Sequence, residues 1–205
     1  NNELEVVESL GLQNSMDCIF VRPVFYQNRT WGGVRADGNL NHDAYISEMM
    51  VGFMDRFYST DATREGRTLM GYSAGGFAAM TQFQRHPDVW GYCVAWDAPL
   101  TTPYGAFDQS AYFGTEAQFN AFNPYQNFVA QKAAYTDRTR LVFGGSAIFA
   151  ADTTAMYARL VAEIGNPMNN GGGDYATTIT DPGGLWWKIN KAEAVHNFTP
   201  NWVEP

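Results

Sequence analysis

Positive charge is scarce in this sequence, and so are long hydrophobic runs. The chain has 13 lysine and arginine residues against 21 aspartate and glutamate residues, which gives a formal net charge of −8. Nucleic acids and anionic membrane surfaces bind proteins through basic patches, so this balance argues against both as partners. No apolar run approaches the roughly 20 residues that a membrane-spanning helix needs, so we expect no membrane span.

Cysteine is nearly absent as well. The two cysteines, Cys18 and Cys93, each lie inside an apolar run, and we interpret them as buried free thiols rather than as a disulfide. The two cysteines therefore do not indicate in which cellular compartment the protein works. The low charge and the abundance of Asn, Gly and Thr favour an extracellular or cell-surface protein over a cytoplasmic one.

The sequence also shows no pattern typical of metal or phosphate binding. His42 beside Asp43 is the nearest approach to a metal site, and such a pair is more typical of the start of a helix. No glycine-rich loop of the phosphate-binding or dinucleotide-binding kind occurs. We expect neither a metal nor an organic cofactor.

Apolar and aromatic side chains are plentiful. Hydrophobic residues make up 45% of the 205 residues and aromatic residues 15%, while only 17% are charged. A chain of this length and composition buries a substantial core, and neither a linker nor a repeat divides it. We therefore predict a single domain over residues 1–205, with an aromatic-lined surface or cleft.

Strand-like and helix-like segments alternate along the chain, which predicts an α/β fold with a mostly parallel sheet and helices on both faces. We expect strands at 18–21, 68–70 and 92–96, another at 141–143, and a last one near 175–179 or 186–189. Helices are expected at 4–10, 44–58, 74–86 and 153–164. The second of these has one apolar face, formed by Tyr45, Ile46, Met49, Met50, Phe53, Met54 and Phe57. The aromatic, proline-rich and glycine-rich excursion over about 97–124 is interpreted as a lid or a wall of a substrate site.

The most informative motif is Gly71-Tyr72-Ser73-Ala74-Gly75, a G-x-S-x-G pentapeptide. An apolar run precedes it and a helical pattern follows it, ending at His86 before a proline. A serine on a sharp turn from strand to helix is held in strained backbone geometry with its hydroxyl exposed at the edge of a sheet. The helix that follows directs its N-terminal amides to the same place. This context predicts that Ser73 is a nucleophile rather than a solvated turn residue.

A nucleophilic serine needs a histidine to take its proton. Of the three histidines, His86 lies at the far end of the helix that follows Ser73, and His42 precedes that helix. His196 comes after the last expected strand, which agrees with the Ser–acid–His order of α/β-hydrolases. We therefore predict His196 as the base.

The carboxylate that orients this histidine has two leading candidates, with Asp181 as a distant third. Asp152 follows the 141–143 strand, where the acid is expected, but it also suits the N-cap of the next helix. Asp97 ends the 92–96 strand, from which a carboxylate can also reach the histidine. The sequence leaves the choice open.

Other parts of the site follow from the same arrangement. The backbone amide of Ala74, directly after the nucleophile, is the expected oxyanion donor. Substrate contacts are expected from Trp31, Tyr72, Trp96 and Trp186, although core packing is the alternative role for each aromatic residue.

From Trp31 to Trp202 the chain resembles the serine esterase family that groups feruloyl esterases, acetyl-xylan esterases, S-formylglutathione hydrolase and the mycolyltransferases. The matching segments are Trp31-Gly32-Gly33, the pentapeptide with Gly76, His86-Pro87-Asp88-Val89-Trp90, and His196 with Phe198. The Ser-Ala-Gly-Gly sequence is also similar to that of polyhydroxyalkanoate depolymerases. The resemblance implies an α/β-hydrolase fold, ester cleavage, Ser73 as nucleophile, His196 as base and Ala74 as oxyanion donor.

The chain departs from this family in two ways. Ala147 stands where the family has its acid, in Gly144-Gly145-Ser146-Ala147. The first strands of the fold are missing from this chain, so we expect an N-terminal segment or another chain to complete the sheet. The resulting hypothesis is a serine esterase that acts through an acyl-enzyme, with a polysaccharide or polyester acyl ester as substrate. The alternatives are a non-catalytic binding domain with a degenerate site, or an acyltransferase that uses the same Ser73 and His196.

Overall fold

The computed structural model describes residues 3–25, 31–107, 109–128, 141–144 and 149–164. In chain order its elements are α1 (Glu3–Ser9), α2 (Leu12–Ser15), α3 (His42–Ala44), η1 (Tyr45–Met50), α4 (Val51–Phe57), η2 (Arg64–Gly66), β1 (Thr68–Tyr72), α5 (Ala74–Arg85), β2 (Tyr92–Trp96), α6 (Gln109–Phe113), α7 (Glu116–Phe122), α8 (Pro124–Asn127), β3 (Leu141–Gly144) and α9 (Ala150–Ile164).

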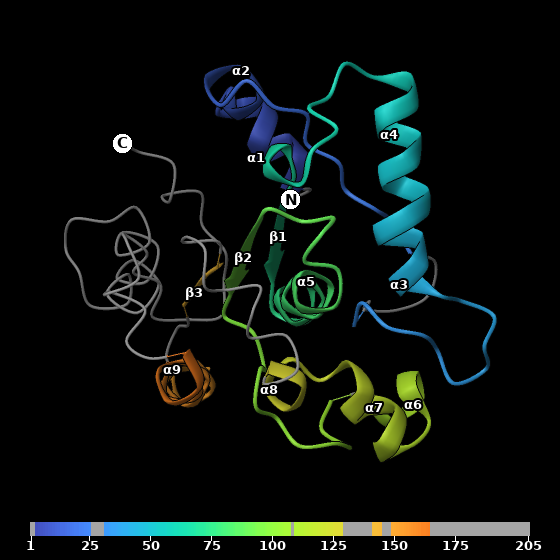
Figure 1. Ribbon diagram of the computed structural model, residues 1–205, viewed down its shortest axis with the longest axis vertical. Coiled ribbons are helices and arrows are strands. Elements are labelled where there is room, and N and C mark those ends of the chain that lie inside the picture. Colours follow the sequence, from blue (N-terminus) through green and yellow to red (C-terminus); the bar gives the residue numbers. More distant parts are fainter. Residues whose placement is uncertain (1–2, 26–30, 108, 129–140, 145–148, 165–205) are drawn as a thin grey trace.

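In the described part of the chain the strands form a three-stranded sheet in the order β1-β2-β3. Both strand pairs are parallel, with Tyr72 opposite Trp96 and Trp96 opposite Gly144. The carboxyl ends of all three strands therefore meet at one edge, with β2 between the other two (Figure 1). The strands predicted at 68–70, 92–96 and 141–143 are confirmed.

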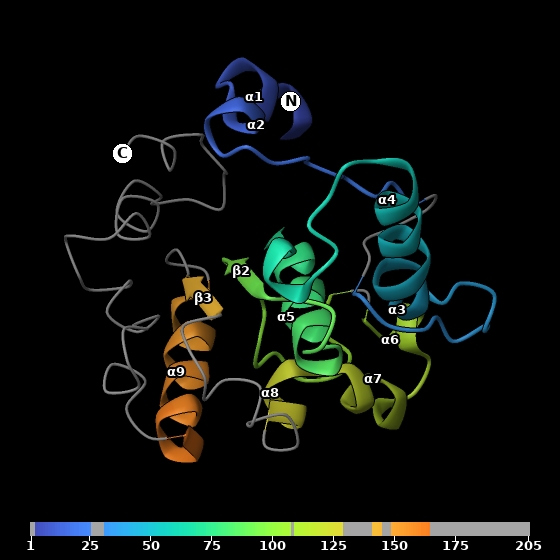
Figure 2. The same ribbon diagram turned by 45° about the horizontal axis from the view of Figure 1, so that its top comes forward.

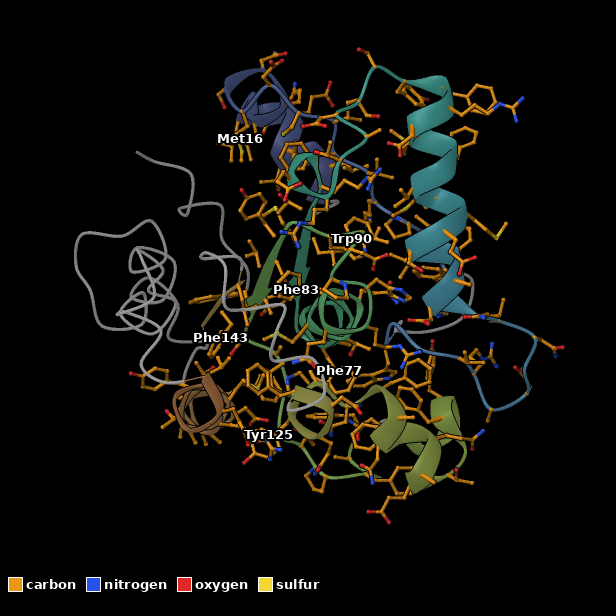
Figure 3. All side chains as sticks on the ribbon, in the orientation of Figure 1. Met16, Phe77, Phe83, Trp90, Tyr125 and Phe143 are labelled. Carbon is orange, nitrogen blue, oxygen red and sulfur yellow. The ribbon has the colours of Figure 1, made fainter. Side chains whose placement is uncertain are left out.

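Helix α5 covers one face of this sheet. Side chains alternate along a strand, so Cys93 and Ala95 of β2 point to the same face and pack with Met80 and Phe83 of α5. Phe143 of β3, Met156 and Leu160 of α9 and the partly buried Tyr125 of α8 belong to the same cluster; Phe83, Phe143 and Tyr125 are labelled in Figure 3. This cluster is the main core of the described structure.

Helices α1 and α2 pack on the other face of the sheet. Tyr72 and Trp96, at alternate positions to the residues that face α5, form a small cluster with Val7 and Leu12. In Figure 2, α1 and α2 lie at the top of the view, whereas α8 and α9 lie at its bottom. Helices on both faces of a parallel sheet confirm the predicted layer arrangement.

The predicted excursion at 97–124 contains regular structure. It holds α6 and α7, and Phe113 and Phe119 from these helices pack with Trp31 and with Phe77 of α5 in a second buried cluster. Helix α8 follows directly and begins at Pro124, with Asn123 accepting hydrogen bonds from the amides of Tyr125 and Gln126 as its cap. The excursion is thus anchored on the helix that follows Ser73.

The helix predicted at 44–58 forms, but its apolar face is only half covered. The chain is helical from His42 to Phe57 through α3, η1 and α4, and Ile46, Met50 and Val51 pack on the main core. Met49, Phe53 and Phe57 are 66%, 53% and 61% exposed. These residues lie on the side turned away from the described core, so only part of the predicted apolar face is buried.

The strand predicted at 18–21 does not form. These residues are irregular chain, with Cys18, Ile19 and Val21 exposed. A short apolar run becomes a strand only where a neighbouring strand supplies hydrogen bonds, and no described strand pairs with this one. The prediction of a buried Cys18 is wrong for the same reason, whereas Cys93 is buried; both thiols are free. The strands predicted near 175–179 or 186–189 lie outside the described residues.

Candidate active site

Ser73 lies on a sharp turn between β1 and α5. Its φ of 56° and ψ of −126° place it in the left-handed half of the backbone map, a conformation that costs a non-glycine residue about 1–3 kcal/mol. The Ser73 amide donates to the carbonyl of Trp96 at 3.0 Å, and the Ser73 carbonyl accepts from the Phe77 amide at 3.1 Å. The turn is therefore held by hydrogen bonds to β2 on one side and to α5 on the other.

Gly71 of the motif and Gly76, which follows it directly, make this turn possible by close packing. A Cβ at Gly71 would collide with the carbonyl group of Gly75, and a Cβ at Gly76 would lie 2.8 Å from the Cβ of Ala98. A Cβ at Gly75 would meet nothing within 4 Å. Gly71 and Gly76 thus let α5 approach the sheet, while Gly75 leaves open space next to Ser73.

The position of Ala74 fits its predicted role. Ala74 is the first residue of α5, a helix of 12 residues, and is buried. The first amides of a helix have no intrahelical acceptor and lie at the positive end of the helix dipole. An oxyanion formed at Ser73 would meet this end of α5, so the Ala74 amide stays our predicted donor.

Asp97 comes directly after β2, just as Ser73 comes directly after β1. It follows Trp96, as Ser73 follows Tyr72, and these two preceding residues are register partners. Asp97 is only 1% exposed and has a φ of 47°. Its amide donates to the Gly144 carbonyl at 2.8 Å, which ties it to the end of β3.

Asp152 has a different environment. It lies inside the first turn of α9, which begins at Ala150, so it is not the N-cap that the sequence suggested. Its Oδ1 accepts from the Thr101 amide at 2.7 Å, from the Thr101 hydroxyl at 2.9 Å and from the Thr102 hydroxyl at 3.3 Å. Asp152 therefore joins α9 to the chain that leaves β2.

The two histidines in the described part of the chain form hydrogen bonds away from Ser73, with Tyr112 and Asp43. His86 is the C-cap of α5, at the opposite end of the helix from Ser73. His42 is buried, with Nδ1 2.6 Å from the Tyr112 hydroxyl. Burial and the charge of Arg35 lower the pKa of His42, which favours its neutral form. The predicted base His196 lies outside the described residues, as do Trp186 and Ala147.

A buried polar cluster around Asp43 escaped the sequence analysis. Asp43 accepts from Gln82 at 2.9 Å, from Arg85 at 3.1 and 3.2 Å, and from His86 at 3.0 Å. Gln82 also donates to the Gly32 carbonyl at 2.8 Å. The spacing of Gln82, Arg85 and His86 places them on one face of α5 and was the available signal. In the described residues no group of three or more His, Cys, Asp or Glu side chains is arranged to hold a metal ion.

Two of the aromatic residues predicted to contact substrate are buried. Trp31 is 1% exposed and packs edge-to-face on Phe77 at 5.0 Å. Trp96 is 4% exposed and packs with Leu12. Both side chains are therefore part of the hydrophobic core. Tyr72 is half-buried beside Trp96.

A family model described as "Putative esterase" matches residues 22–163, which is more than half of the chain. The chain belongs to this esterase family. This membership confirms the resemblance found in the sequence, and together with the parallel sheet between helices it confirms an α/β-hydrolase fold.

One solved structure similar to this esterase-family chain is described as a ferulic acid esterase. The two share 15% sequence identity with a TM-score of 0.48, over 60% of this chain and 48% of that one. The chain thus spans about half the length of that structure. No curated protein matches the chain. The range matched by the esterase family includes Ser73, Asp97 and Asp152 and ends before His196.

Proposed function

We propose that this chain is a serine carboxylic-ester hydrolase that acts through an acyl-enzyme. The observation that supports this most directly is the backbone of Ser73, a strained non-glycine residue at the junction of β1 and α5. Strain of this kind persists where the surrounding structure enforces it, and it is concentrated at functional sites. Gly71 and Gly76 enforce it here through the close packing described above.

The proposed reaction has two steps. The Ser73 hydroxyl attacks the acyl carbon of the ester, its proton passes to His196, and the Ala74 amide stabilises the oxyanion. The alcohol leaves with the proton from His196, and the acyl group stays on Ser73. Water then attacks the acyl-enzyme, His196 again takes and returns the proton, and the carboxylic acid departs. One of the two aspartates, Asp97 or Asp152, holds the imidazole in the tautomer that accepts this proton.

The family resemblance in the sequence favours an acyl ester of a polysaccharide or a polyester, which would suit a secreted enzyme. In the described part of the chain, no helix combines the length and the hydrophobicity that crossing a bilayer requires.

A fluorophosphonate probe tests the proposed nucleophile, because it reacts covalently only with an activated serine. We expect the wild-type chain to be labelled, Ser73→Ala to be unlabelled, and Ser110→Ala, which removes an exposed serine of α6, to be labelled like wild type. Absence of labelling in folded wild-type protein would leave the non-catalytic binding domain as the better hypothesis. If labelling occurs, product analysis with and without a sugar acceptor separates hydrolysis from acyl transfer.

A further inference from the structure

We propose that Asp97, and not Asp152, is the carboxylate that positions the proton-accepting histidine, and that Asp152 fastens α9 to the chain after β2. This inference rests on the proposed function, since it concerns the same site. It places the acid directly after β2, although the usual place is after the next strand.

The first argument is the register of the sheet. Ser73 and Asp97 follow the paired residues Tyr72 and Trp96, and the Ser73 amide bonds the Trp96 carbonyl at 3.0 Å. Neighbouring strands are about 4.8 Å apart, so the backbones of the nucleophile and of Asp97 lie side by side at the carboxyl edge of the sheet. An imidazole above this edge would have Ser73 and Asp97 as immediate neighbours.

The second argument is the environment of Asp97. Its residue is 1% exposed, and a carboxylate removed from water is costly unless cationic or hydrogen-bonding groups stabilise it. An imidazolium formed during proton transfer would add to the interactions that the buried Asp97 already makes. With a φ of 47°, Asp97 has a positive φ at the end of its strand, as Ser73 does.

The third argument is the environment of Asp152. One of its carboxylate oxygens already accepts three hydrogen bonds, two from Thr101 and one from Thr102. These bonds join the first turn of α9 to the segment that begins the excursion. These hydrogen bonds give Asp152 a structural role, and they direct that oxygen toward Thr101 and Thr102.

The test is the rate of fluorophosphonate labelling of the full chain as a function of pH, in Asp97→Asn and Asp152→Asn. For Asp97→Asn we expect a loss of at least about 100-fold, because the histidine loses the group that selects its tautomer. We also expect the acid limb of the profile to move to lower pH by about one unit, because a nearby carboxylate raises the pKa of a histidine. A merely structural residue would not move this limb.

The same measurement on Asp152→Asn distinguishes the two aspartates. We expect a loss of less than about tenfold, an unmoved acid limb and a lower melting temperature. Asp88→Asn, a change at an exposed position, is the control and should behave like wild type in every respect. If Asp152→Asn shows the large loss and the shifted limb, the assignment is overturned in favour of Asp152.

A second variant at Asp97 guards against misfolding. Asp97→Gly removes the carboxylate, and glycine adopts the observed positive φ without strain, so the turn is kept. Labelling within threefold of wild type in either Asp97 variant overturns the proposal. Wild-type protein that is unlabelled, or Ser73→Ala that is still labelled, would instead refute the proposed function, so the two failures are distinguishable.

Discussion

The two glycines of the G-x-S-x-G motif, Gly71 and Gly75, have different packing environments. Gly71 has the Gly75 carbonyl against the place where a Cβ would be, whereas the corresponding space at Gly75 is empty. The sequence pattern identified the turn because its residue types are specific. It did not indicate which glycine is required by packing, since that depends on the approach of α5 to the sheet.

We expect Gly71→Ala to be strongly destabilising and Gly75→Ala to be tolerated. A methyl group at Gly71 collides with backbone that cannot move without displacing α5, which should cost about 3 kcal/mol. For a chain of this size that lowers the melting temperature by about 6–12 °C. At Gly75 the methyl group enters open space in a helix, so the melting temperature should stay within about 2 °C of wild type or rise.

Differential scanning calorimetry of the two variants beside wild type measures this contrast. The Gly75 variant serves as the matched control, since it makes the same chemical change four residues away. Equal destabilisation of both variants would mean that the close packing at Gly71 is not what constrains the turn.

His42 is a residue whose protonation should alter stability. Burial and the charge of Arg35 lower its pKa in the folded chain below the usual 6.5. The unfolded chain therefore binds the proton more readily, so the contribution of His42 is complete above pH 6.5 and is lost as the pH falls from there toward the folded-state pKa. Urea unfolding at pH 7.5 and 5.5 should show a smaller pH effect in His42→Gln than in wild type. An identical pH effect in both proteins would contradict this account.

At the scale of elements, α5 is held at both ends. Its N-terminus follows the Ser73 turn, and at its C-terminal end Gln82, Arg85 and the C-cap His86 form hydrogen bonds with Asp43 of α3. Burial raises the pKa of Asp43, but the hydrogen bonds from His86 and Arg85 and their charges outweigh it, so the net pKa lies below the usual carboxylate value. The cluster therefore fixes the helix on which the proposed site is built.

Replacing Asp43 by Asn should destabilise the chain in a pH-dependent way. The substitution removes the negative charge from a partly buried ion pair, but the amide oxygen can still accept a hydrogen bond. It should therefore lower the free energy of unfolding by about 2–3 kcal/mol at pH 7. Because the folded-state pKa is lowered, the contribution of Asp43 is complete above about pH 4 and is lost as the pH falls through the folded value. The difference between wild type and Asp43→Asn in the free energy of unfolding should therefore shrink from pH 6 to pH 3.

Urea unfolding at several pH values measures this difference, and Asp88→Asn at an exposed position is the control that should show none. A difference that stays constant down to pH 3 would mean that the charge of Asp43 is not what holds the cluster together.

A helix or strand could be predicted from the sequence where the residues that determine it lie close together in the chain. Helix α5 was predicted from residues 74–86 because Phe77, Met80 and Phe83 recur at helical spacing and Pro87 follows the end. The exposure of Phe53 and the irregular chain at 18–21 were not predictable, because each depends on which neighbour covers it. The same holds for Asp152, whose partners Thr101 and Thr102 are about 50 residues away.

At the scale of the whole molecule, the proposed site combines residues that are far apart in the sequence. Ser73 and Asp97 are brought together by the pairing of β1 with β2, and the predicted base, His196, follows long after β3. The order of these residues could be predicted from the sequence. Their geometry could not, because it follows from sheet register and from the strained backbone at Ser73 and Asp97.

Chemical rescue tests whether His196 completes this site. We expect His196→Ala to lower the rate of fluorophosphonate labelling by at least about 100-fold, because general-base catalysis contributes about 10²–10⁴. Imidazole at about 50 mM should restore labelling by about tenfold or more, since it can occupy the space of the missing ring and accept the proton from Ser73. The measurement is the labelling rate with and without imidazole on the full chain.

The matched control is His86→Ala. His86 lies at the end of α5 opposite to Ser73, and a helix of 12 residues is about 18 Å long. Its loss should therefore lower stability through the Asp43 cluster while the labelling rate of the folded protein stays within about threefold of wild type and does not respond to imidazole. If imidazole rescues neither variant and His196→Ala is labelled as fast as wild type, another group takes the proton from Ser73, and the base has to be sought elsewhere in the chain.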